Sequence, residues 1–164
     1  MNGLRKSTLL FLVRRDEETG EISDVCLAMK RRGFGEGRWN GSGGKCEPGE
    51  SAEDAVRRET EEEILVSPGE ITQVAEIEFR FPHEPDWDQL VSVFLTEDWE
   101  GEPGESEEMS PAWFGIHDIP FDDMWPDDPF WLPRVLDGES LRARFVFGEG
   151  DEILEQEIKA VSGF

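Results

Sequence analysis

Residues 44–65 read GKCEPGESAEDAVRRETEEEIL. A loop rich in turn residues begins this stretch, and a helical pattern follows it. Ser51 is a favourable N-cap residue, and Asp54 stands three residues later, at the position of a weak capping box. The sequence therefore predicts a helix over residues 51–64.

One face of this helix carries apolar and acidic side chains in a single stripe. Ala52 and Val56 begin the stripe, and helical spacing continues it to Glu59 and Glu63, with Glu62 alongside. Like charges one turn apart repel, and burying them unpaired is costly. A divalent cation removes both penalties, and hard oxygen ligands suit Mg²⁺ or Mn²⁺. The alternative is a solvated acidic helix, since 39 of the 164 residues are Asp or Glu.

Strands are expected on both sides of this helix. Apolar or alternating runs flanked by turn residues predict strands over residues 7–13, 24–31, 71–81, 90–96, 112–116, 141–147 and 153–161, the last two as a hairpin. A glycine-rich loop over 33–49, an acidic loop over 98–108 and a short helix over 128–136, interrupted by Pro133, complete the pattern. We therefore expect an α/β (α+β) fold with a mixed sheet and helices on its faces. No repeat or linker divides the chain, so residues 1–164 are expected to form one domain.

Composition disfavours several function classes. Sixteen Lys and Arg residues oppose 39 Asp and Glu residues, and a net charge of −23 disfavours binding to nucleic acid polymers. No apolar run approaches the roughly 20 residues of a membrane span, and no secretory signal is expected. Cys26 and Cys46 form neither a disulfide framework nor a CxxC motif, so the reducing cytoplasm is the expected compartment. No P-loop or GxGxxG motif is present, and His83 and His117 are too far apart for HExxH zinc chemistry.

The acidic excess itself has two interpretations. The carboxylates are scattered along the chain instead of forming one tail. They form either a strongly anionic, solubilising surface or an adaptation to concentrated salt, in which self-repulsion is screened. The sequence leaves both open.

The spacing around the helix resembles the Nudix box, G-x5-E-x7-R-E-U-x-E-E-x-G-U, in which U is a bulky aliphatic residue. Gly44, Glu50 and the run RETEEE at residues 58–63 match this motif in register. Thr60 stands at the first U, and Leu65 stands where the motif has glycine. Because glycine makes an easy left-handed helix end, we expect a different exit from this helix. The resemblance implies a Nudix-type fold, a mixed β-sheet sandwiched between helices.

Two further segments resemble the branch of the Nudix family that hydrolyses oxidised purine nucleoside triphosphates. They are MKRRGFGEGRWNGSGGK at residues 29–45 and IPFDDMWPDDPFWLP at residues 119–133, and the similarity extends from about Thr8 to the terminal hairpin. The resemblance implies that water attacks a phosphorus of the triphosphate, releasing nucleoside monophosphate and pyrophosphate and so sanitising the nucleotide pool. It also implies Mg²⁺ as cofactor, with Mn²⁺ as a substitute, to neutralise phosphoryl charge and activate the water.

Carried over to matching positions, the resemblance implies a role for each residue. Arg58 would position the acids of the box, and Glu63 would orient or deprotonate the attacking water. The catalytic residues would be Arg58, Glu59, Glu62, Glu63 and Glu108, and these four glutamates with the Gly43 carbonyl would hold the metal. The substrate-binding residues would be Thr8, Lys30, Phe34, Asn40, Ser42, Gly43, Gly44, Lys45, Phe79, Trp125, Pro126, Asp127 and Asp128, with both lysines facing the phosphates.

The base pocket also makes sense from the side chains alone. Trp125, Phe34 and Phe79 can face the flat π surface of a purine, and Asn40 can both donate and accept hydrogen bonds. The adjacent carboxylates of residues 127–128 raise the pKa of one member of the pair, so that one can accept while the other, protonated, donates. The alternatives are a helix cap for the first aspartate and core packing for the aromatic rings.

Two other functions stay open at this point. One is a Nudix pyrophosphohydrolase of another nucleoside diphosphate derivative, and the other is a non-catalytic module that holds a cation or nucleotide. The MWPDD segment at residues 124–128 argues against the first, and the complete glutamate set argues against the second. The expected partners are small-molecule purine nucleoside triphosphates, without nucleic acid polymer or membrane, and the expected state is a monomer.

We expect KCl, added up to molar concentrations, to raise the melting temperature, because salt screens the repulsion within a chain of net charge −23. Thermal unfolding followed by circular dichroism in dilute and molar KCl checks this expectation. A melting temperature that stays flat or falls would contradict it.

Overall fold

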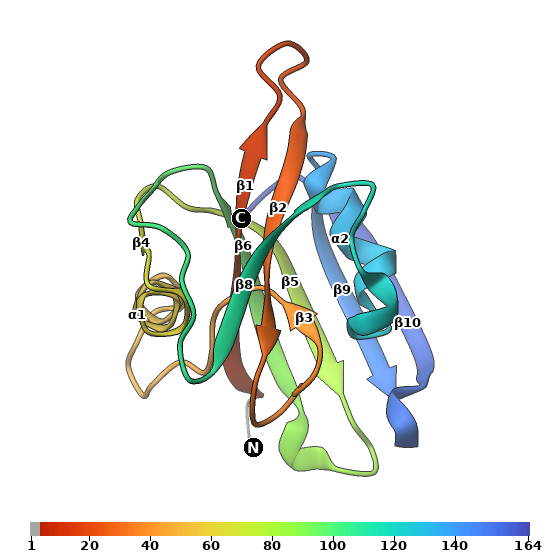
Figure 1. Ribbon diagram of the computed structural model, residues 1–164. Coiled ribbons are helices and arrows are strands. Elements are labelled where there is room, and N and C mark those ends of the chain that lie inside the picture. Colours follow the sequence, from red (N-terminus) through yellow and green to blue (C-terminus); the bar gives the residue numbers. More distant parts are fainter. Residues whose placement is uncertain (1–3) are drawn as a thin grey trace.

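A computed structural model describes residues 4–164 and shows a large sheet with two helices (Figure 1). The strands of the main sheet are β1 (Arg5–Arg15), β2 (Ile22–Lys30), β3 (Trp39–Asn40), β5 (Thr72–Arg80), β6 (Gln89–Thr96), β8 (Met109–Gly115), β9 (Ser140–Phe147) and β10 (Ile153–Val161). The helices are α1 (Ala52–Ile64) and α2 (Asp128–Leu136), with 3-10 turns η1 (Pro85–Trp87), η2 (Phe121–Asp123) and η3 (Glu149–Asp151). A separate ribbon pairs β4 (Ser67–Pro68) with β7 (Trp99–Glu100).

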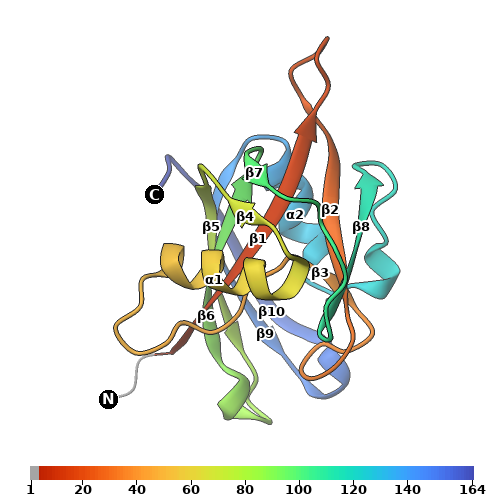
Figure 2. The same ribbon diagram turned by 60° about the vertical axis from the view of Figure 1, so that its left-hand side comes forward.

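The sheet is mixed, in the order β10-β9-β5-β6-β1-β2-β3, with β8 also paired to β2. Strand β1 runs parallel to β6, and β5 runs parallel to β9, whereas the other pairs are antiparallel. Helix α1 lies on one side of the strands and α2 on the other (Figures 1 and 2). The expected sheet sandwiched between helices is therefore confirmed. Neither helix in the described part of the chain is long and apolar enough to cross a membrane.

Strand β1 lies between β6 and β2 in the sheet, and side chains on both of its faces are buried. Leu10 and Leu12 pack in the cluster that includes Val56 and Ile64 of α1. Phe11 and Val13 point the other way, into the larger cluster that contains the apolar side chains of α2. A strand covered on both faces reads as an unbroken apolar run, which is what residues 9–13 show.

The strands and helices predicted from the sequence are present, with ends shifted by at most three residues. One prediction about them is wrong, because α2 continues through Pro133 without interruption. Pro133 lies in the second turn of α2, where its missing N–H removes one backbone hydrogen bond, and its carbonyl still accepts from Asp137 N at 3.0 Å. Strands β3, β4 and β7 were missed because a two-residue strand has no periodicity to detect.

The prediction that α1 ends differently from the motif is also wrong. Leu65 adopts the left-handed conformation that a glycine would adopt at this position. Its φ is 65° and its ψ is 26°. The Ile64 carbonyl accepts a hydrogen bond from Gly104 N at 2.9 Å, which satisfies one group at the helix end. The Leu65 side chain is 55% exposed, so little packing offsets a conformational cost of about 1–2 kcal/mol.

We expect Leu65→Gly to stabilise the fold, because glycine adopts positive φ without the clash of a β-carbon. A gain of about 1 kcal/mol corresponds to a rise in melting temperature of about 2–4 °C for a chain of this size. Leu65→Ala is the matched control, since it removes the same side chain but keeps the strained backbone. Equal melting temperatures for the Gly and Ala variants would contradict the assignment of strain to Leu65.

Candidate active site

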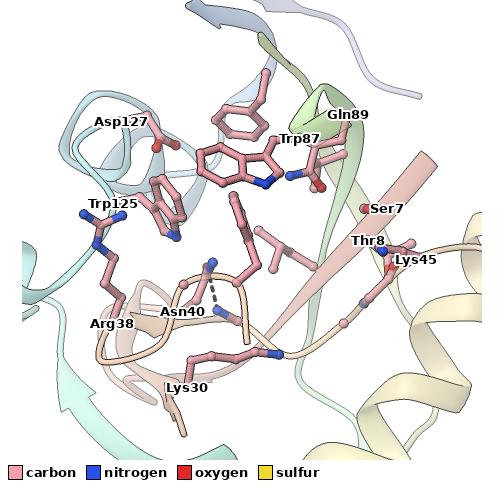
Figure 3. Close-up of a pocket in the computed structure, with 18 of the residues that line it drawn as sticks. Ser7, Thr8, Lys30, Arg38, Asn40, Lys45, Trp87, Gln89, Trp125 and Asp127 are labelled. Atoms are coloured by element: carbon pink, nitrogen blue, oxygen red, sulfur yellow. Dashed lines mark hydrogen bonds between the residues drawn. The ribbon is translucent and has the colours of Figure 1, made fainter. Parts of the chain in front are cut away.

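A cavity of about 450 Å³ opens between β1, the glycine-rich loop, the β5–β6 connection and the start of α2 (Figure 3). Side chains expected on the phosphate side and on the base side of a nucleotide both reach it. The residues that line it, among those predicted from the sequence, are Thr8, Lys30, Phe34, Asn40, Gly43, Gly44, Lys45, Glu63, Phe79, Trp125, Asp127 and Asp128. The fold therefore assembles one site from segments more than 100 residues apart.

Ser42 and Pro126 do not line this cavity, and their assignment as substrate-binding residues stays a prediction. The Ser42 hydroxyl is buried 3.0 Å from the Thr60 hydroxyl, and its backbone N–H and carbonyl both bond to Leu10. All its polar groups are thus used between β1 and α1. The same contact explains why residue 60 is a threonine where the motif has an aliphatic side chain. Pro126 is half-buried and follows Trp125 in the sequence, but it does not line the cavity.

Gly43 and Gly44 let the loop lie directly on β1 and α1. The Gly44 carbonyl accepts a hydrogen bond from Thr8 N at 2.9 Å, and Gly43 has a φ of 146°. A β-carbon at Gly43 would lie 2.1 Å from the Thr8 carbonyl oxygen, and one at Gly44 would lie 2.7 Å from the Glu59 carboxyl carbon. Only glycine fits at position 43, whereas a β-carbon at position 44 would require the Glu59 carboxylate to shift. This pair therefore sets how closely the loop approaches the glutamates.

Glu63 is the buried acid of α1, with 3% of its surface exposed. Its Oε1 accepts a hydrogen bond from Gly43 N at 2.8 Å, and its Oε2 lies 3.9 Å from Lys30 Nζ. The same ammonium lies 3.9 Å from Glu108 Oε2, so two carboxylates from distant segments flank one cation. Burial raises the pKa of Glu63 to about 7, and the Gly43 amide and Lys30 only partly oppose this shift.

Arg58 organises the remaining acids of the helix. Its Nε and Nη2 donate to the Glu50 carboxylate at 3.0 and 2.9 Å, and its Nη1 donates to Glu59 at 2.8 Å. These hydrogen bonds lower the pKa of Glu50 to about 2. Glu62 lies 4.0 Å from the same guanidinium, and its side chain is 62% exposed. Arg58 therefore fixes Glu59 beside the loop and leaves Glu62 free to turn toward a ligand.

The predicted metal ligands are only partly assembled. Within residues 4–164, no three Asp, Glu, His or Cys side chains gather at metal-binding distance. Carboxylates repel one another, and each one contacts a nearby donor instead. These contacts are Glu59 with Arg58, Glu63 with Gly43, and Glu108 with Lys30. The donor set still fits a hard divalent cation, since it offers only oxygen and includes a buried carboxylate.

Asp127 and Asp128 are both buried at the inner end of the cavity, each 2% exposed. Asp127 Oδ2 accepts a hydrogen bond from Trp131 Nε1 at 2.7 Å, and Asp127 caps no backbone N–H of α2 although it stands at the N-cap position. Asp128 Oδ2 has no hydrogen-bond partner in the described chain. Burial raises the pKa of Asp127 to about 6, and burial beside Asp127 raises the pKa of Asp128 further above its ordinary value. The helix-cap alternative therefore finds no support.

Sequence reasoning missed several residues of the cavity wall, among them Arg38 and Trp87 on its aromatic side. The Arg38 guanidinium lies 4.1 Å from the centre of the Trp125 ring and 2.9 Å from the Asp151 carboxylate. The Trp87 ring lies 5.4 Å from that of Phe34, which stacks on Trp125 at 5.0 Å. Arg38 belongs to the quoted glycine-rich segment, so its charge beside aromatic residues was a usable signal. Trp87 lies in a turn, where neither periodicity nor motif marks it.

Known proteins share both the sequence and the fold. A NUDIX domain model matches residues 3–135. The Mus musculus protein named oxidized purine nucleoside triphosphate hydrolase is 43% identical over 140 residues, which are 85% of this chain and 89% of that protein. The Danio rerio protein of the same name is 42% identical over 137 residues, 84% of this chain and 87% of its own length.

A MutT protein from Bacillus halodurans shows the same fold, with a TM-score of 0.79, 24% identity, and coverage of 95% of this chain and 98% of its own. The domain match spans most of the chain, and the two animal proteins exceed 40% identity over nearly their whole length. The chain belongs to the Nudix family.

Proposed function

We propose that this chain hydrolyses oxidised purine nucleoside triphosphates, of the 8-oxo-dGTP and 2-hydroxy-dATP class, to the monophosphate and pyrophosphate, and so sanitises the nucleotide pool. The names of the mouse and zebrafish relatives support this substrate class. An Escherichia coli protein named 8-oxo-dGTP diphosphatase, 36% identical over 86 residues, supports it too. The observation that carries the proposal is the buried pair of aspartates at the end of an aromatic cavity.

The pair suits the edge of an oxidised purine. Because the pKa of each carboxyl is raised, Asp127 and Asp128 can share one proton near neutral pH, and the pair can then donate to a carbonyl and accept from an N–H. The free Oδ2 of Asp128 is available for one of these bonds. Asn40 lines the same cavity and adds an amide donor, while Trp125 offers a stacking face.

The phosphate side follows from the acids and lysines around the glycine loop. Nudix hydrolases in general need a divalent metal, and in our proposal the ligands are Glu59, Glu62, Glu63, Glu108 and the Gly43 carbonyl. When bound, Mg²⁺, or Mn²⁺ in its place, supplies charge neutralisation and lowers the pKa of water. Glu63 then orients or deprotonates the attacking water, and Arg58 holds Glu59 in place. Lys30 and Lys45 bind the phosphate oxygens.

The proposal also covers the domain organisation, the oligomeric state and the cellular compartment. We propose one domain over residues 1–164, because β9 and β10 extend the sheet that carries the site. We also propose that the chain acts as a monomer in the cytoplasm. A Nudix enzyme of another nucleotide derivative would have no use for a proton-sharing acid pair at the base. A non-catalytic binding module would not require the buried Glu63 beside the loop.

We expect the wild-type chain with Mg²⁺ to release pyrophosphate faster from 8-oxo-dGTP and 2-hydroxy-dATP than from dGTP, dATP or methylated purine triphosphates. Glu63→Gln should lower kcat by about a hundredfold or more, typical of losing one acid–base group, while the melting temperature shows an intact fold. A pyrophosphate-release assay across this panel measures both effects. Equal rates on normal and oxidised purines would reject the substrate class, and near-normal turnover by Glu63→Gln would reject its role.

The two aspartates provide a second arm of this experiment. Asp127→Asn and Asp128→Asn each replace a carboxyl by a neutral amide, and losing one required hydrogen bond lowers kcat/KM by about ten- to a hundredfold. The loss should differ between 8-oxo-dGTP and 2-hydroxy-dATP, because their edges present different donors. Small and equal effects on both substrates would remove the pair from base recognition.

The buried pair also predicts how stability depends on pH. A carboxyl with a higher pKa in the folded than in the unfolded chain stabilises the fold at low pH, and this stability is lost as pH rises through the folded pKa. We therefore expect the melting temperature to fall as pH rises from about 4 through 6 and above, less steeply in Asp128→Asn than in wild type. Asp122→Asn, an exposed aspartate nearby, is the charge-matched control. Parallel curves for wild type and Asp128→Asn would refute the raised pKa.

A further inference from the structure

The connection between β5 and β6 carries Trp87 into the cavity wall. Its ring centre lies 5.4 Å from Phe34, 5.6 Å from Phe81 and 5.7 Å from His83, each time in an edge-to-face arrangement. The side chain is 36% exposed, so the ring is not simply buried in the core. In Figure 3 the indoles of Trp87 and Trp125 reach toward the same cavity from different elements.

The turn that carries Trp87 is tied to its surroundings. Asp88 Oδ1 accepts a hydrogen bond from Phe81 N at 2.7 Å, which closes the turn onto the end of β5. The Arg5 guanidinium donates to the Asp86 carbonyl, which joins the turn to β1. The fold therefore places the Trp87 ring instead of leaving it on a free loop.

The Phe34 ring lies between Trp87 and Trp125, the indole on which the purine is proposed to stack. Phe34 stands between the two indoles, stacked on Trp125 at 5.0 Å and edge-on to Trp87 at 5.4 Å. A purine that stacks on Trp125 beside or in place of Phe34 thus comes within contact distance of Trp87. Phe34 is 45% exposed, and the glycines on either side of it have φ values of 80° and 86°, a backbone conformation that places its ring between the two indoles.

We propose that Trp87 is a specificity-determining residue that forms the second aromatic wall of the base subsite. This inference rests on the proposed function. An indole presents a larger π surface than the other side chains, and it contacts the two fused rings of a purine more extensively than the single ring of a pyrimidine. Trp87 supplies no acid, base or charge. It therefore acts on the affinity for the base and not on the chemical step.

Substitution at Trp87 separates affinity from chemistry. We expect Trp87→Leu to raise KM for 8-oxo-dGTP by about ten- to a hundredfold, the usual effect of losing one base-stacking ring, with kcat within about twofold of wild type. Trp87→Phe should restore most of the affinity, because it keeps a smaller aromatic wall. Calorimetric titration with 8-oxo-dGMP without metal measures the same loss as a weaker Kd, independently of turnover.

Trp113→Leu is the matched control, since this half-buried indole packs on Trp99 and Arg14 and does not line the cavity. Its KM should equal that of wild type. Circular dichroism reports the folding of each variant, and should Trp87→Leu fold poorly, the milder Trp87→Phe still gives a measurable rise in KM. A wild-type KM in the folded Trp87 variants overturns the inference while leaving the proposed function intact. A wild-type chain that neither binds nor hydrolyses oxidised purine nucleotides overturns both.

Discussion

The contact of the glycine loop with β1 and α1 is the constraint on which the rest of the site depends. Gly43 brings the loop backbone so close to Thr8 that no β-carbon fits between them, and a β-carbon at Gly44 would displace the Glu59 carboxylate. At this distance the Gly43 amide reaches the Glu63 carboxylate, and the loop can continue to the cavity wall at Asn40. The contact holds because β1 is buried on both faces, which prevents the strand from shifting its register.

The two halves of the site have different origins along the chain. The acids of the proposed phosphate side come mostly from one helix, so their spacing is encoded in a single short segment. Glu108, Lys30, Lys45 and the Gly43 carbonyl join them from other segments. The base side is built from β1, the glycine-rich loop, the β5–β6 connection and the start of α2. Substrate choice can therefore change through wall residues without disturbing the helix that carries the chemistry.

Buried carboxylates are the costly feature of this protein. The chain already carries 23 excess negative charges, yet Glu63, Asp127 and Asp128 lie inside it with few donors to compensate them. Burying such groups destabilises the fold and raises the pKa of each. All three line one cavity. Because buried acids of this kind are costly for a core, their presence around a single cavity indicates a functional site.

Periodicity, caps and motif spacing are local properties of the chain, so the long strands, both helices and the inward position of Glu63 follow from the sequence alone, whereas the two-residue strands β3, β4 and β7 do not. The matching segments also identify twelve of the residues that line the cavity, including Trp125 and both aspartates, because these segments are long and specific. The packing of distant segments sets the pairing of Ser42 with Thr60. The bond from Trp131 to Asp127 four residues before it and the left-handed conformation of Leu65 are local features that no sequence pattern marked. The positions of Arg38 and Trp87 depend on how distant segments pack. The residues next to a side chain in the sequence do not determine which groups it contacts across an interface, because those groups come from other parts of the chain.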